Sequence, residues 1–279
     1  MTIAVTAATG QLGRLAIAAL KARGHSPIAL ARNPAKATDL GVPVRAFDYF
    51  TADAGAVAGV DVLVLISSND FNDRTGQHAR VIAAAKAAGV GRIVYTSILK
   101  GAASPLILAQ DHIVTEADLR ASGLPFTVLR NGWYTENYAG SLGGAIAGGA
   151  MVGTAGDARL STAARADYAE AIAVVASADG HAGQIYELAG DNAYTLADMA
   201  AEVSRQTGKA LPYADMPSDA YQALLVSFGL PEGLVVALAD SDTHAKAGHL
   251  FDDSKTLSRL IGRPTTPMAA TVAATLAAL

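Results

Sequence analysis

Residues 3–13 read Ile3-Ala4-Val5-Thr6-Ala7-Ala8-Thr9-Gly10-Gln11-Leu12-Gly13. A short apolar run leads into a turn with two glycines, and an alanine-rich helical stretch follows from residue 12 to residue 23. Glycine lets a backbone approach a pyrophosphate without a Cβ atom in the way, and the helix start offers unpaired N–H groups and a positive dipole end. This strand–loop–helix pattern is typical of dinucleotide binding, and the alternative is an ordinary tight turn.

The loop departs from the Gly-x-x-Gly-x-x-Gly pattern at its first position, which holds Ala7. Gly10 and Gly13 keep the positions that approach the pyrophosphate and that pack the helix against the strand. If the turn needs a positive φ at residue 7, alanine costs of order 1 kcal/mol there, and otherwise it costs nothing.

Apolar runs alternate with helical stretches through the first half of the chain. The runs are rich in Val, Ile and Leu and are continuously apolar, which indicates strands covered on both faces, as in a parallel sheet. Glycines follow several helical stretches at the expected C-cap place: Gly24, Gly59, Gly89 and Gly123. The predicted strands are 3–6, 27–31, 42–47, 60–66, 92–96 and 126–130, and the predicted helices are 12–23, 52–58, 75–88 and 106–121. This alternation predicts an α/β fold with a Rossmann-like, doubly wound parallel sheet.

After residue 130 the alternation stops, and an aromatic and then glycine-rich stretch runs to Met151-Val152. Thr195 and Ser254 are predicted helix N-caps. The remaining predicted elements are helices 165–178, 196–206, 255–261 and 268–279, a strand at 184–188, and one or two helices within 217–247 interrupted at Gly229-Leu230-Pro231. We therefore expect a dinucleotide-binding domain at 1–133, with contributions from about 160–189, and a smaller, partly interwoven C-terminal α/β substrate lobe at 134–279.

Composition narrows the functional classes. The chain has 279 residues, of which 51% are hydrophobic and 16% charged, with a net charge of −4 and no cysteine. The negative charge argues against binding nucleic acid by phosphate neutralisation, and the cysteine count excludes disulfides, thiolate metal sites and cysteine nucleophiles. Residues 137–156 lack charge but are too glycine-rich for a membrane span, so we expect a soluble cytoplasmic protein.

Cofactor preference depends on the end of the second predicted strand, about 20 residues after the glycine loop. No carboxylate is present there to bind a ribose 2′-hydroxyl; instead Arg32 can pair with a 2′-phosphate, helped by the Asn33 amide. NADP(H) is therefore favoured over NAD(H), the alternative being that Arg32 is a solvated loop residue. Asp48 follows the third strand and can reach the adenine edge or be a surface turn residue. Ser67 and Ser68 end the fourth strand, where the nicotinamide side of the cofactor is expected.

A standard catalytic tyrosine is missing. None of the nine tyrosines has a lysine four residues later, which removes the Tyr-x-x-x-Lys pair that protonates a secondary alkoxide. His112 and Glu116 are four residues apart on a predicted helix, so the carboxylate could orient or charge the imidazole, or the two form a surface ion pair. The other histidines are scattered, and no metal site is expected.

The stretch 129–138 holds the only tryptophan of the chain and leaves the sixth predicted strand at its carboxyl end. Its amides and aromatic rings suit a flat, partly polar substrate near a nicotinamide ring; alternatively, Trp133 and Tyr134 are hinge packing between the lobes. The candidate substrate-binding residues are Asn131, Trp133, Tyr134 and Asn137.

Taken together, these stretches resemble the NmrA-like atypical short-chain dehydrogenases, above all their NADPH-dependent quinone oxidoreductases and triphenylmethane-dye reductases. The segments that carry the resemblance are 6–13, 30–36, 66–68, 94–97, 129–138 and 260–267. The resemblance implies a quinone near Tyr134 and Asn137, and direct hydride transfer to an aromatic or quinone-like small molecule with no flavin. It also implies that NADPH is held by Thr9, Gly10, Gln11, Leu12, Gly13 and Arg32.

Tyr134 and His112 are the candidate catalytic residues, although a quinone needs a dedicated acid less than an alcohol does because the developing hydroquinone anion is a weak base. The alternative function is a non-catalytic NADP(H)-sensing regulator, and azo, imine or enone reduction stays open as related chemistry. A homodimer is also left open.

Overall fold

The computed structural model describes all residues, 1–279, and the chain forms two compact units. The first unit comprises Met1–Gly101, Gln110–Asn131 and Arg165–Glu187. The second comprises Ala102–Ala109, Gly132–Ala164 and Leu188–Leu279. The predicted division into domains 1–133 and 134–279 stays a prediction.

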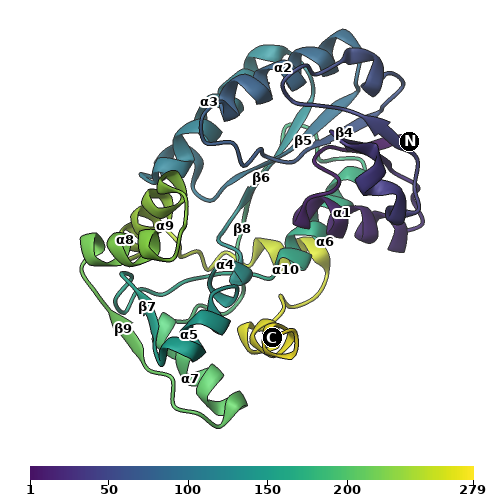
Figure 1. Ribbon diagram of the computed structural model, residues 1–279. Coiled ribbons are helices and arrows are strands. Elements are labelled where there is room, and N and C mark those ends of the chain that lie inside the picture. The colour runs from purple at the N-terminus through teal and green to yellow at the C-terminus, as the bar shows by residue number, and fades with distance from the viewer. The chain divides into compact units, whose positions relative to one another are not determined.

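The first unit is built on a seven-stranded sheet in the order β3-β2-β1-β4-β5-β6-β8 (Figure 1). Its strands are β1 (Ile3–Val5), β2 (Ile28–Ala31), β3 (Val44–Ala46), β4 (Val62–Leu65), β5 (Arg92–Ile98), β6 (Phe126–Asn131) and β8 (Ile185–Leu188). The five pairings from β3 to β6 are parallel. Residue numbers also increase together across β6 and β8, where Gly183 N donates to Phe126 O and Val128 N to Gln184 O. The predicted doubly wound parallel sheet is confirmed.

Strand order places the topological switch point between β1 and β4, because the chain adds β2 and β3 on one side of β1 and the later strands on the other. Thr6 joins the two strands there: its hydroxyl donates to Val64 O and accepts the Ile66 N–H, each at 3.0 Å. In open parallel sheets, ligands bind beyond the carboxyl ends of the strands at this point.

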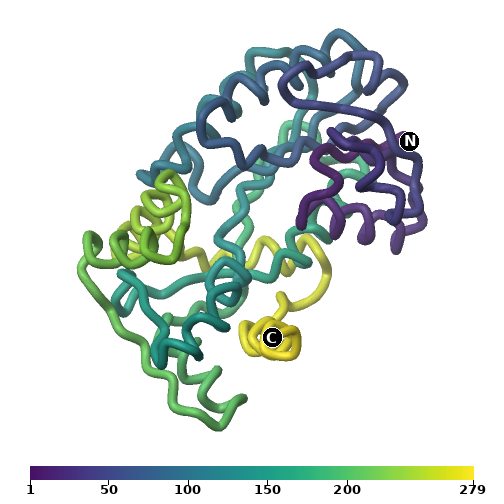
Figure 2. The backbone as a smooth tube through the Cα atoms, viewed as in Figure 1, coloured from purple at the N-terminus to yellow at the C-terminus, as the bar shows by residue number.

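Helices α1 (Gln11–Ala22), α2 (Arg74–Ala87), α3 (Ile107–Ser122) and α6 (Arg165–Ser177) accompany the sheet, and α6 packs along α1 (Figure 2). The 3₁₀ helices are η1 (Pro34–Leu40), η2 (Ala54–Val57) and η3 (Gly101–Ala103). The α-helix predicted at 52–58 was wrong, because only one short turn forms before Gly59 takes a left-handed φ of 71°. The other three predicted terminating glycines are also left-handed: Gly24, Gly89 and Gly123.

The second unit contains most of the remaining helices and a small parallel sheet of β7 (Met151–Gly153) and β9 (Tyr213–Asp215). Its helices are α4 (Thr135–Ala139), α5 (Leu142–Gly148), α7 (Leu196–Thr207), α8 (Ser218–Ser227), α9 (Glu232–Ala245), α10 (Thr256–Ile261) and α11 (Met268–Ala277). The predicted helix break at 229–231 is confirmed by the connection between α8 and α9.

Local sequence signals succeeded unevenly in this unit. Thr195 caps α7 in a capping box with Asp198, as its position predicts. Ser254 was wrong as the cap of α10: the cap is Lys255, at a left-handed φ of 55°, while the Ser254 hydroxyl accepts the Thr256 N–H at 3.3 Å. Helix α5 was not predicted because its sequence LGGAIAG has poor helix propensity, and contacts with β7 and α11 stabilise it instead.

None of the helices is both long and apolar enough to cross a lipid bilayer.

Candidate functional site

The loop after β1 turns tightly against the first turn of α1. Ala7 has a φ of 47°, so the turn does require a left-handed residue at the position where the alanine departs from the motif. The strain is of order 1 kcal/mol relative to glycine. A Cβ atom on Gly13 would lie 2.3 Å from Ala7 O, so only glycine fits where the helix meets the loop.

The start of α1 is shaped to receive an anion. Gly10 is its N-cap in an extended conformation, and no side chain caps the N–H groups of the first turn. Thr9 is half-buried, Gln11 is exposed, and Leu12 packs its side chain inside. Uncapped N–H groups together with the helix dipole fit the pyrophosphate of a dinucleotide.

Arg32 lies directly after β2 with its side chain exposed, and it makes no hydrogen bond or ion pair within the chain. The adjacent Asn33 uses its side-chain oxygen to accept the Ala35 N–H at 3.1 Å and so caps η1. Arg14 of α1 anchors the same 3₁₀ helix, because its guanidinium donates to Lys36 O at 2.7 Å and pairs with Asp39 at 2.6 Å. Arg14 also holds the pKa of Asp39 below its ordinary value, chiefly by this hydrogen bond.

The other predicted cofactor residues lie at the carboxyl ends of the neighbouring strands. Asp48 follows β3, and its carboxylate accepts the Phe50 N–H at 3.0 Å, which shapes the turn. Ser67 and Ser68 follow β4. Ser67 N donates to the hydroxyl of Thr96 on β5 at 2.9 Å, whereas the Ser68 hydroxyl donates to Gln77 Oε1 of α2 at 2.7 Å. The sheet therefore brings the glycine loop, Arg32, Asp48 and this serine pair to one edge.

Helical spacing suggested a contact between His112 and Glu116, but their side chains form neither a hydrogen bond nor an ion pair. Both side chains are buried, so the surface ion pair was also wrong. His112 Nδ1 lies 2.7 Å from the Tyr95 hydroxyl inside the sheet–helix layer, and burial, followed by the positive charge of Arg74, lowers the imidazole pKa well below 6.5. The ring is therefore neutral at physiological pH.

Glu116 instead binds Arg130, the side chain near the end of β6. The guanidinium makes a bidentate pair with the carboxylate, at 2.9 and 2.8 Å, and a further bond of 2.8 Å to Glu187. Burial alone would raise the pKa of Glu116, but hydrogen bonds from Arg130 and Ser97 outweigh it and the pKa is lowered. A Cβ atom on Gly101 would lie 2.2 Å from the Arg130 guanidinium carbon, so the backbone of residue 101 packs directly on this ion pair.

The predicted substrate residues follow β6 along the chain. Asn131 ends the strand and is buried, and its carbonyl accepts the Leu99 N–H at 2.9 Å. Trp133 and Tyr134 are half-buried and Asn137 is exposed. Tyr134 is the N-cap residue of α4, and its carbonyl accepts the Asn137 N–H at 3.0 Å, so one helical turn presents both predicted substrate contacts.

One buried hydroxyl and one buried carboxylate hold α4 within the second unit. Tyr138 donates to Asp242 Oδ1 of α9 at 2.8 Å, and Thr154 N donates to the other carboxylate oxygen at 3.2 Å. Burial raises the pKa of Asp242, and the hydrogen bonds from Tyr138 and Thr154 oppose that rise. Neither partner stands out in the sequence, because an aspartate 104 residues away can be matched to Tyr138 only in the folded chain.

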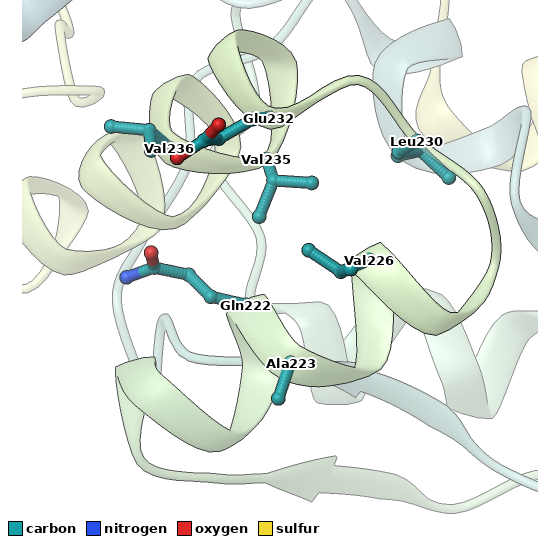
Figure 3. Close-up of a pocket in the computed structure, with 7 residues that line it drawn as sticks. All are labelled: Gln222, Ala223, Val226, Leu230, Glu232, Val235 and Val236. Atoms are coloured by element: carbon teal, nitrogen blue, oxygen red, sulfur yellow. The ribbon is translucent and has the colours of Figure 1, made fainter.

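A groove of about 390 Å³ opens between α8 and α9, where Val226 and Val235 face one another (Figure 3). Leu230 and Val236 extend its apolar lining, and Gln222 and Glu232 are its polar members. None of the predicted site residues lines this groove, and we assign it no role. No group of three or more histidine, aspartate or glutamate side chains is arranged to hold a metal ion.

The switch point, the glycine loop and the uncapped helix start define a dinucleotide-binding α/β protein. A family model described as NAD(P)H-binding matches residues 7–179. The chain belongs to this NAD(P)H-binding family.

Relatives with an assigned activity support this membership. The chain is 50% identical over 277 residues to quinone oxidoreductase 2 of Escherichia coli, an alignment covering 97% of each protein. The crystal structure of that NADPH-dependent enzyme complexed with NADPH superposes with a TM-score of 0.94 at 49% identity, covering 99% of this chain and 100% of that one. The Citrobacter triphenylmethane reductase complexed with NADP(H) gives a TM-score of 0.92 at 33% identity, over 98% of this chain and 100% of that one. The predicted resemblance to NmrA-like quinone and dye reductases is confirmed.

Replacing Gly13 with alanine tests the close approach of α1. The new Cβ atom would overlap Ala7 O, so we expect G13A to lower the free energy of unfolding by about 1–3 kcal/mol in urea titrations. G144A is the matched control, because no atom lies within 4 Å of that Cβ position in helix α5. It should gain up to about 1 kcal/mol from helix propensity. Equal stability of G13A and the parent protein would contradict the packing described.

His78 of α2 makes stability depend on pH. Burial, followed by the charge of Arg74, lowers its pKa from 6.5 to about 3. Below about pH 6.5 the unfolded chain binds a proton at this residue and the folded chain does not, so stability is lost as pH falls and is unaffected above pH 7. The loss is about 1.4 kcal/mol per pH unit. In urea titrations between pH 7 and pH 4, H78Q should show a slope shallower by this amount, and parallel curves would refute the assignment.

Proposed function

We propose that the protein is an NADPH-dependent oxidoreductase that reduces a quinone or a similar conjugated, electron-poor acceptor by direct hydride transfer, without flavin or metal. The observation that carries the proposal is the 50% identity to quinone oxidoreductase 2, which extends over 97% of both chains. Hydride transfer from the C4 carbon of NADPH is the chemistry that the cofactor supplies when bound.

The first unit would hold the cofactor at the carboxyl edge of its sheet. The left-handed Ala7 and the missing Cβ at Gly13 bring the loop close to α1, and the uncapped N–H groups of that helix suit the negative charge of a pyrophosphate. Arg32 has no partner within the chain, and its planar guanidinium suits a 2′-phosphate. The proposed cofactor contacts are Thr9, Gly10, Gln11, Leu12, Gly13, Arg32, Asp48, Ser67 and Ser68.

The turn at α4 would supply most of the acceptor contacts. Tyr134 and Asn137 lie on one turn of α4, and Trp133 precedes it. Together with Asn131 they offer aromatic surface for a flat ring and amide donors for its oxygens. The anchor from Tyr138 to Asp242 keeps that turn fixed, and a fixed turn lowers the entropic cost of orienting the acceptor.

The acceptor must gain one proton in addition to the hydride. Tyr134 is half-buried and follows the end of β6, which supports it as the nearer of the two candidate donors to the acceptor. His112 is buried against Tyr95 and neutral, so a role for it would pass through the Tyr95 hydroxyl. A hydroquinone anion is a weak base that water can protonate, which agrees with the lack of a Tyr-x-x-x-Lys pair.

The test is anaerobic loss of NADPH absorbance with purified protein and a small quinone, with no flavin added. Turnover that stops when the quinone is omitted is expected. Tight dinucleotide binding with no turnover across quinone, azo and enone acceptors would instead support the NADP(H)-sensing regulator. A cytoplasmic location and a homodimer stay predictions.

Arg32 should decide which dinucleotide is used. In R32D the 2′-phosphate loses its charged partner and meets a carboxylate, so the NADPH dissociation constant should rise about 10–100-fold while that of NADH changes less than about threefold. K36D, on η1, makes the same change of charge at an exposed neighbouring position and is the control. Titration of nucleotide fluorescence measures both constants. Equal weakening of NADPH and NADH by R32D would remove the 2′-phosphate role.

A further inference from the structure

Both peptide groups of Ser68, directly beyond β4, are held by side chains of α2. The Ser68 N–H donates to His78 Nε2 at 2.9 Å. The Ser68 carbonyl accepts from Arg74 Nε at 2.6 Å. His78 is fully buried and Arg74 nearly so, which means that neither bond competes with water.

Both side chains are linked to Asp111 of α3, Arg74 directly and His78 through Thr115. His78 Nδ1 lies 2.9 Å from the Thr115 hydroxyl, which donates to Asp111 O at 2.9 Å. Arg74 reaches the carboxylate of Asp111 at 3.1 Å. The bonds therefore form a closed ring that runs from Ser68 through His78, Thr115, Asp111 and Arg74 and back to Ser68.

Only one arrangement of protons satisfies every hydrogen bond of this ring. A backbone N–H can only donate, so His78 Nε2 accepts and the imidazole proton sits on Nδ1. Nδ1–H donates to the Thr115 oxygen, whose own proton goes to Asp111 O. In an imidazolium, Nε2 would carry a proton and would face the Ser68 N–H, which is also a donor. The ring therefore requires a neutral His78 with its proton on Nδ1.

The hydroxyl groups of Ser67 and Ser68 differ in how they are bonded. The Ser68 hydroxyl donates to Gln77 and accepts the Asp70 N–H at 3.1 Å, so its one proton is used inside the chain. The Ser67 hydroxyl makes a long contact of 3.4 Å to Ser68 O and also interacts with the Tyr95 hydroxyl. The Ser67 hydroxyl lies outside the ring and its bond to Ser68 O is long, so Ser67 is the better candidate of the two serines to bind a ligand through its hydroxyl.

We propose that His78 is a positioning residue: through the ring it fixes the Ser68 peptide groups, and it thereby aims the Ser67 hydroxyl at the nicotinamide end of the cofactor. The inference rests on the proposed function, since the switch point between β1 and β4 is where that end would lie. A reacting geometry displaced by 1 Å can cost about 100-fold in rate, so a loop held on both of its peptide groups has a kinetic consequence.

Three variants dissect the ring. H78L removes both imidazole bonds, whereas H78Q keeps an acceptor for the Ser68 N–H. T115V leaves the histidine in place but removes the partner of Nδ1–H. H181Q is the matched control, because His181 of the same unit bonds the Tyr186 hydroxyl and does not contact the loop.

A spectroscopic readout on the cofactor-free protein comes first. The ¹⁵N shifts of the His78 ring should show a neutral Nδ1–H tautomer from pH 8 to pH 5. T115V should keep this tautomer, because the Ser68 N–H still requires Nε2 as its acceptor. A protonated ring, or an Nε2–H tautomer in the parent protein, would overturn the inference whatever the enzyme does.

Kinetics supply the second readout, in kcat per folded molecule at saturating NADPH. We expect H78L to lose 10–100-fold, T115V to lose 3–10-fold, and H78Q and H181Q to stay within threefold of the parent protein. Unchanged kcat in both H78L and T115V would overturn the positioning role even if their Tm falls. If H78L does not fold, T115V decides alone. Absence of turnover in the parent protein would count against the proposed function instead, and the tautomer measurement would still judge the ring.

Discussion

The close approach of α1 to the loop after β1 is the constraint on which the cofactor edge depends. The loop carbonyl of Ala7 accepts the Gly10 N–H at 2.9 Å and occupies the space that a Cβ of Gly13 would need. Only this contact lets the helix begin directly over the end of β1, so that its dipole and free N–H groups face the switch point. The left-handed alanine in the same turn shows that the geometry is kept even where it is strained.

Polar groups buried behind this edge make it rigid. A buried hydrogen-bonding group is costly if it is left unsatisfied, so a complete set of partners specifies one arrangement. The ring through Ser68 acts in this way behind β4, and the pairs that Arg130 makes with Glu116 and Glu187 act in this way at the end of β6. The α/β frame thus supports the chain beyond β4 and at the end of β6 by buried polar contacts.

The proposed hydride transfer to a conjugated acceptor suits a site that positions its ligands but has no standard catalytic tyrosine. Without a Tyr-x-x-x-Lys pair, a reductase that relies on positioning is suited to acceptors that become weak bases once reduced. In the proposed function the aromatic and amide groups on the turn at α4 orient the acceptor, and the buried bond from Tyr138 to Asp242 supports that turn. The same frame with a different acceptor surface would serve azo or enone reduction, which is why fold alone does not specify the acceptor.

The sequence by itself determined the parallel α/β fold, the glycine loop, the terminating glycines and the place of Arg32 at the end of the second strand, because these depend on local signals: apolar runs, tight turns and one residue after a strand. It did not predict α5, the cap at Lys255 or the true partner of Glu116. Helical spacing paired Glu116 with His112, whereas folding offers Arg130 from a strand, and a bidentate guanidinium is the better partner for a buried carboxylate. His78 looked like one scattered histidine among six. Only the tertiary structure decided its role, because its two partners, Ser68 and Thr115, lie 10 and 37 residues away and meet only when α2 and α3 pack beside β4.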